Sequence, residues 1–174
     1  MDLRVIESGN GGELVKNPRD FEIVRSFENM PYLAMFGGNL KASTPSRRLE
    51  NEQAFDWWGN NLLFDNDSSR QFNSETERVL NSVSLTSSGR VLIEQAVKRD
   101  LEFMKPFAEV SVSVSIPTVD KVVIAITLKE PGNLKDKKFM YIWDAARNEI
   151  GYADNFSTVI TGKIFDFSFD ETFE

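Results

Sequence analysis

The sequence predicts an α+β domain, in which an N-terminal arm and two to three helices precede an antiparallel β-sheet of about four strands. Two observations lead to this prediction. Apolar residues recur every three or four positions between residues 74 and 104, and from residue 108 onward they alternate with polar residues. Helices followed by a run of strands are typical of the α+β class. The 174 residues, 41% of them hydrophobic, are enough for one sizeable core.

The first segment predicts a small antiparallel unit followed by a short helix. Asn10 and Gly11 both tolerate positive φ, so they favour a hairpin turn, and "NPRD" predicts a second turn. In "NMPYLAMFGGN", Pro31 suits the first helical position and Gly37 suits closing the helix in the left-handed conformation. This helix has few polar residues, so we expect it to be buried or docked.

The polar stretch around Pro45 predicts an exposed connection. We therefore divide the chain into an N-terminal arm, residues 1–45, and an α+β domain, residues 46–174.

Two helices are expected in the second part. Ser74 and Glu77 have the spacing of a capping box at a helix start. The second helix is predicted over residues 87–104, ended by Pro106, with an apolar stripe at i, i+4, i+8 and i+11. The stripe consists of Ile93, Val97, Leu101 and Met104.

Three strands follow at "AEVSVSVSI", "KVVIAITLKE" and "KKFMYIWDA", and residues 146–155 are expected to be irregular. A last strand is predicted in "STVITGKIFDFSFDETF", where Phe165, Phe167 and Phe169 alternate with acidic or hydroxyl residues. This strand either closes the protein's own sheet or is exchanged with another chain, since edge strands offer unpaired backbone groups. In both cases the phenylalanine row needs to be covered.

The composition argues against most enzyme classes. Histidine and cysteine are both absent, which removes imidazole bases, thiolate nucleophiles, disulfides and the common zinc sites. We therefore expect no catalytic residue, no metal and no cofactor. The 27 acidic and 20 basic residues give a formal net charge of −7, which opposes binding to nucleic acids or anionic membranes. The first residues show no signal peptide, so we expect synthesis and folding in a cytosol.

The stretch "FDWWGNNLLF" raises the question of a ligand platform. On a helix, Trp57 and Trp58 point about 100° apart, too far for one flat stacking surface. Core packing for one ring and packing or subunit contact for the other is favoured. Nearby acidic residues leave open a glycan-binding or cell-wall-cleaving site that uses Trp57.

Three segments together resemble the baseplate wedge, or sheath-initiator, family of contractile-tailed bacteriophages, including its Mu-like branch. They are "FDWWGNNLLF", "SSGRVLIEQAVKRDLEFMKPFAEVSVSVSI" and "KVVIAITLKEP". The family's Glu-Pro-Arg core motif is replaced here by "MKPFAEV", in which only Pro106 corresponds. The resemblance implies a sheet that exchanges strands with the sheath subunit, and no active site.

We therefore expect a non-enzymatic structural subunit of a phage tail baseplate, located in the virion and assembled in the host cytoplasm. It links wedge components to the first sheath ring, and copies of it surround the tail. The alternative is a glycan-binding or cell-wall-cleaving tail accessory protein. The predicted partner-binding residues are Tyr32, Phe36, Trp57, Trp58, Ile164, Phe165, Phe167 and Phe169.

Overall fold

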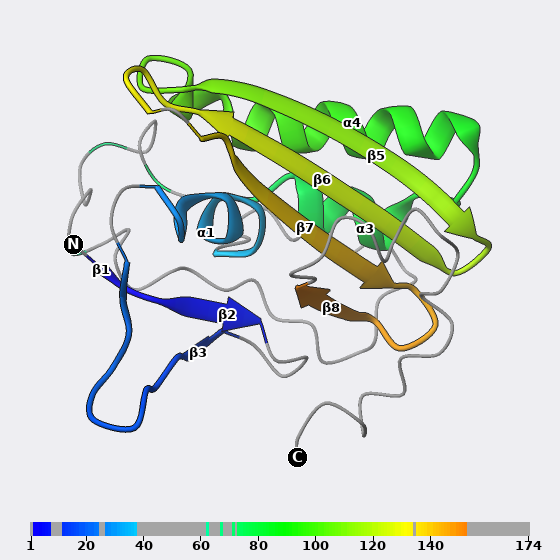
Figure 1. Ribbon diagram of the computed structural model, residues 1–174. Helices are drawn as coiled ribbons and strands as arrows, with labels where there is room; N and C mark the ends of the chain where they lie inside the picture. The colour runs from blue at the N-terminus through cyan, green and yellow to red at the C-terminus, as the bar shows by residue number, and fades with distance from the viewer. Residues whose placement is uncertain are drawn as a thin grey trace.

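The computed structural model describes residues 2–7, 12–24, 27–37, 62, 67, 71, 73–133 and 135–152 (Figure 1). The arm holds four short strands: β1 (Asp2–Leu3), β2 (Val5–Glu7), β3 (Gly12–Leu14) and β4 (Ile23–Val24). The helices are α1 (Met30–Phe36), α3 (Thr76–Ser82), α4 (Ser87–Asp100) and the 3₁₀ helix η1 (Glu102–Met104). The remaining strands are β5 (Glu109–Thr118), β6 (Lys121–Lys129), β7 (Lys137–Asp144) and β8 (Glu149–Tyr152).

Strands β5 to β8 form one antiparallel sheet in the order β5-β6-β7-β8, so the predicted α+β fold is confirmed. The predicted C-terminal strand, with Ile164 and the phenylalanine row, lies outside the described residues.

The core lies between this sheet and helices α3 and α4, which stand behind it in Figure 1. The period-2 pattern of β6 buries alternate apolar residues on the helix side, and Ile124 lies directly opposite Tyr141 of β7. From α4, Ile93 and Val97 are fully buried in the same cluster. Burying one such aliphatic side chain contributes about 1.5–3 kcal/mol. The first half of the predicted stripe is therefore the face of α4 that packs on the sheet.

Helix α4 is shorter than the sequence predicted. It ends at Asp100 and not at Met104, and the chain continues as η1. Leu101 and Met104 are both buried in the core. The tighter 3₁₀ turn brings residues three apart onto one face, which places both side chains inward. Pro106 lies beyond this turn and does not set the helix end.

The prediction of an irregular segment at residues 146–155 was wrong for residues 149–152, which form β8. The turn that leads into β8 is closed by Asn148, whose φ of 58° lies in the left-handed region. The carboxylate of Asp144 accepts hydrogen bonds from the backbone N–H groups of Ala146 (3.0 Å) and Arg147 (3.2 Å). This Asp and Asn turn chemistry was the sequence signal for a hairpin.

The arm contains a small β structure, called the arm sheet, which consists of two antiparallel strand pairs and one isolated bridge. β1 pairs with β4, β2 pairs with β3, and Lys16 bridges to Phe21 in the loop between β3 and β4. The predicted pairing on both sides of Asn10-Gly11 is confirmed, although the turn itself lies outside the described residues. The "NPRD" turn is also confirmed, because the N–H of Asn17 donates to the carbonyl of Asp20 at 2.8 Å.

Helix α1 ends before Gly37, as predicted, but the expected left-handed conformation was wrong, because Gly37 has a φ of −81°. The helix is docked, as predicted, and it contributes to the main core. Ala34 and Met35 are buried in the cluster that also contains the sheet and α4. The hydroxyl of Ser74 donates to the carbonyl of Met35, and it accepts from the N–H of Glu77 at 3.1 Å. Ser74 therefore caps α3, as the spacing predicted, and joins it to the end of α1. The division into residues 1–45 and 46–174 stays a prediction.

Candidate functional site

The outer edge of β5 is the first candidate site. In the part of the chain that the structure describes, β5 is the end strand of the sheet and pairs with β6 alone. Its ten residues make it the longest described strand. An end strand presents a row of backbone N–H and C=O groups that another strand can pair with. The edge of β5 is therefore suited to strand addition.

The side chains of β5 leave most of this edge unprotected. Natural proteins block sheet edges with lysine, proline or bulges. β5 has Pro117 and a register shift between Ser115 and Thr118, but both lie at one end. From Glu109 to Ser115 the sequence is "EVSVSVS", with no lysine and no proline. One backbone group of this stretch already has a partner, because the guanidinium of Arg90 donates to the carbonyl of Val114 at 3.4 Å.

The two faces of β5 differ. Val114 is buried in the core, whereas Ser111 and Ser113 are exposed. Small hydroxyl side chains on the outer face leave room for a neighbouring strand. The opposite edge of the sheet is different, because β8 has only four residues and lies next to β2 of the arm. The sequence did not single out residues 109–115, although the uncharged "VSVSVS" run was the signal.

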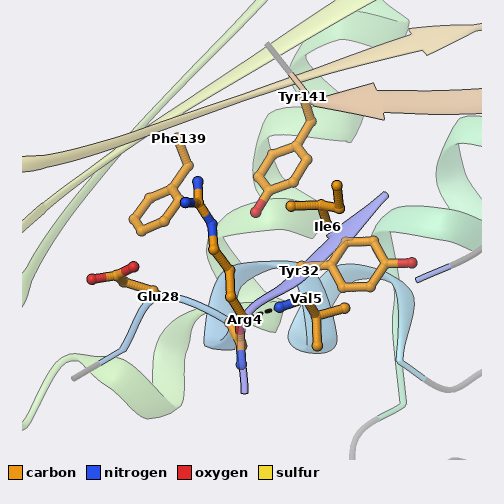
Figure 2. Close-up of a pocket in the computed structure, with 8 residues that line it drawn as sticks. Arg4, Val5, Ile6, Glu28, Tyr32, Phe139 and Tyr141 are labelled. Atoms are coloured by element: carbon orange, nitrogen blue, oxygen red, sulfur yellow. Dashed lines mark hydrogen bonds between the residues drawn. The ribbon is translucent and has the colours of Figure 1, made fainter. Parts of the chain in front are cut away.

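A pocket lies where the first strands of the arm meet α1 and β7, and it is the second candidate site (Figure 2). The residues that line it are Arg4, Val5, Ile6, Glu28, Asn29, Tyr32, Phe139 and Tyr141. Figure 2 shows the side chain of Arg4 extending toward Phe139 and Tyr141. The cavity volume is about 40 Å³, against about 300–1,000 Å³ for usual ligand pockets. It has room for a few water molecules and none for a sugar ring.

The groups around this pocket join parts of the arm to one another, and one ion pair connects the arm to β7. Arg4 forms an ion pair with Glu22 at 2.8 Å, and Glu28 forms one with Lys137 of β7 at 3.3 Å. The buried side chain of Asn29 bonds to the backbone of the strand that contains β1 and β2. These contacts are structural, so the pocket is better described as a junction than as a binding site.

The structure places two of the predicted partner-binding residues at this junction. The rings of Tyr32 and Phe36 lie 5.8 Å apart, and Phe36 lies 6.2 Å from Tyr141. Both side chains are half-buried and pack against the core. Their role in partner contact stays a prediction. Trp57, Trp58, Ile164, Phe165, Phe167 and Phe169 lie outside the described residues.

The carboxyl group of Asp100 has a raised pKa, which is a property that catalytic acids often have. Burial raises its pKa above the ordinary value, against hydrogen bonds that lower it. Its oxygens accept from the backbone N–H groups of Glu75 (2.9 and 3.0 Å) and Thr76 (2.7 Å). These N–H groups belong to the start of α3, so Asp100 caps that helix from the end of α4. The burial and hydrogen bonds of Asp100 are therefore explained by helix capping.

Comparison of the chain with protein-family models, with curated proteins and with solved structures finds no match. Among the described residues, no three carboxylates gather in an arrangement that suits a metal ion. Within the same part of the chain, no helix is long and apolar enough to cross a membrane.

Proposed function

We propose that the protein is a structural, non-enzymatic subunit of a phage contractile-tail baseplate. In this proposal it links wedge components to the first sheath ring, and its sheet is extended by a strand from a neighbouring subunit. Its partners are other wedge proteins, the sheath subunit and further copies of itself in a ring around the tail. Neither nucleic acid nor membrane is among them.

One observation carries the proposal: among the described residues β5 is a long end strand, and from Glu109 to Ser115 its sequence contains no lysine or proline. Within this stretch, the carbonyl of Val114 is already bonded to Arg90. Pairing along seven residues gives an incoming strand several backbone hydrogen bonds. The exposed serines make such pairing insensitive to the partner's side chains. The absence of histidine and cysteine supports a role in assembly rather than in catalysis. The resemblance in "FDWWGNNLLF" and the helix–sheet segment that follows it supports the kind of assembly.

A charge placed on the β5 edge tests the proposal. Ser113→Lys puts an ammonium group on an exposed position of β5, where it opposes pairing with another strand but does not enter the core. Val119→Lys makes the same charge change at a turn residue that is 91% exposed and lies beyond the strand. We expect Ser113→Lys to reduce the number of complete sheathed tails at least about tenfold, and Val119→Lys to leave it unchanged.

The measurement is electron microscopy of tails from cells in which each variant replaces the natural subunit. Circular dichroism of the purified variants confirms that both fold. Equal numbers of complete tails from the two folded variants would show that the β5 edge takes no part in assembly. Normal tails from a variant in which Ser111 and Ser113 are both lysine would show the same.

A further inference from the structure

One face of the arm is apolar and exposed. In the arm, Leu3 lies directly opposite Ile23, Val5 opposite Leu14, and Lys16 opposite Phe21. Residues directly opposite each other in an antiparallel pair, and residues two apart along a strand, point to the same face. All six side chains therefore lie on one side of the arm sheet. The four large exposed hydrophobics on it, called the arm face below, are Leu3 (39% exposed), Leu14 (45%), Phe21 (37%) and Ile23 (58%).

The other side of the arm sheet is directed toward α1. It carries the Arg4–Glu22 ion pair and the buried side chain of Val24. Ile6, two residues beyond Arg4 and therefore on the same side, is half-buried. The arm sheet thus has one face directed toward α1 and one face on which large apolar side chains are exposed. A contiguous exposed apolar face of this kind marks a binding surface.

The chain itself supplies a matching segment. β8 ends at Tyr152, beside β2 of the arm, and 22 residues follow it. Twelve residues separate Tyr152 from Phe165, enough to span roughly 40 Å when extended. In "IFDFSFDETFE", Phe165, Phe167 and Phe169 recur with the period of two that places them on one side of a strand. The segment therefore starts near the arm, reaches it easily and carries an apolar row.

The charges also match. Lys16 lies with its ammonium group 5.2 Å from the centre of the Phe21 ring, and Arg19 is exposed in the adjoining turn. Residues 164–174 contain four acidic residues and no basic one. Lys16 and Arg19, with Asp20 in the same turn, give this rim of the arm face a net positive charge. The segment is acidic, which favours their association.

We propose that, in the free subunit, residues 164–170 of the same chain lie across the arm face, with Phe165, Phe167 and Phe169 on its four hydrophobic side chains. The short connection from β8 keeps the segment at an effective concentration near the millimolar range, which favours the chain's own segment over that of a second copy. This inference goes beyond the proposed function and does not rest on it. In an assembling baseplate, a neighbour that takes up this segment has to displace it from the arm first.

The absence of cysteine from the chain allows a direct test. Ile23→Cys places a single thiol on the arm face, and its reaction with an uncharged maleimide is followed by mass spectrometry. The same variant is prepared with Phe165, Phe167 and Phe169 all changed to serine. We expect the thiol to react at least about tenfold faster in the serine background, which corresponds to about 1.4 kcal/mol of docking free energy. Val119→Cys, at the β5–β6 turn, is the matched control and should react equally fast in both backgrounds.

Equal rates for Ile23→Cys in the two backgrounds would overturn the inference. Protection that increases with protein concentration would assign the arm face to the segment of a second copy, and would overturn the intrachain arrangement. If the triple serine variant fails to fold, charge reversal replaces it: Lys16→Glu with Arg19→Glu should also speed the reaction. The added negative charge by itself slows thiolate formation, so a faster reaction reports that the face is uncovered. Lys135→Glu with Lys138→Glu, near the start of β7, should leave the rate unchanged.

Discussion

The side-chain amide of Asn29 donates a 2.6 Å hydrogen bond to the carbonyl oxygen of Leu3. Its oxygen accepts from the backbone N–H of Val5 at 3.1 Å, so one side chain satisfies the groups that a neighbouring strand would otherwise bond. Asn29 directly precedes α1 and is 4% exposed. The arm strand is therefore fixed to the start of α1 by a buried amide that replaces a strand partner.

Removing this amide should loosen the arm. Asn29→Ala leaves a buried carbonyl and a buried N–H without their partner, and we expect a loss of about 1–3 kcal/mol in the free energy of unfolding. Urea denaturation measures the loss, and hydrogen exchange should show faster exchange at the N–H of Val5. Asn133→Ala, which removes an exposed amide bonded to Glu130, should change the stability by less than about 0.5 kcal/mol. Similar stabilities for the two variants would show that Asn29 does not hold the arm.

The carboxyl group of Asp100 should give stability an unusual dependence on pH. Burial raises its folded-state pKa above the ordinary value of 3.8, so the folded protein binds this proton more tightly than the unfolded chain does. The contribution is fully present below the unfolded pKa and is lost as the pH rises through the folded pKa. The stability of the natural protein relative to Asp100→Asn should therefore be greater at low pH than at neutral pH. Urea denaturation at a series of pH values measures this difference, and one that stays constant would contradict the prediction.

Asp144 should behave in the opposite way. Burial raises its pKa, but the hydrogen bonds and charge of Lys121 and the turn N–H groups outweigh burial, and the net pKa is lowered. Stability from this group is present above the unfolded pKa and is lost as the pH falls through the folded pKa. Asp144→Asn should cost about 0.5–1.5 kcal/mol at neutral pH and less at low pH. Asp136→Asn, at an exposed loop residue, is the control, and an equal cost for both would exclude a role for Asp144 in holding β8.

Gly89 should not tolerate alanine, even though alanine favours helices by about 1 kcal/mol. A Cβ atom at Gly89, in the first turn of α4, would lie 2.0 Å from the carbonyl oxygen of Ser84, which is backbone and cannot rotate away. We expect Gly89→Ala to lower the free energy of unfolding by about 1–3 kcal/mol, and Gln95→Ala, on the exposed side of α4, to be neutral. A thermal unfolding temperature for Gly89→Ala at or above that of the natural protein would contradict the expected close approach.

Local patterns in the sequence determined much of this fold. The 3.6-residue period of α4, the alternation in β5 to β7 and the turn at "NPRD" each lie within one short segment, and the structure confirms them. The capping residue Ser74 was identified in the same way, because a helix cap involves residues three apart.

Other features depend on residues far apart in the chain, and only the tertiary structure decided them. Asp100 caps α3 across 24 and 25 residues, and Asn29 bonds Leu3 across 26. The position of β5 at the end of the described sheet, the early end of α4 and the apolar arm face likewise follow from which elements become neighbours. A local window contains the periodicity that forms an element. It does not contain the partner that the element packs against, since that partner is selected only when the whole chain buries its apolar surface.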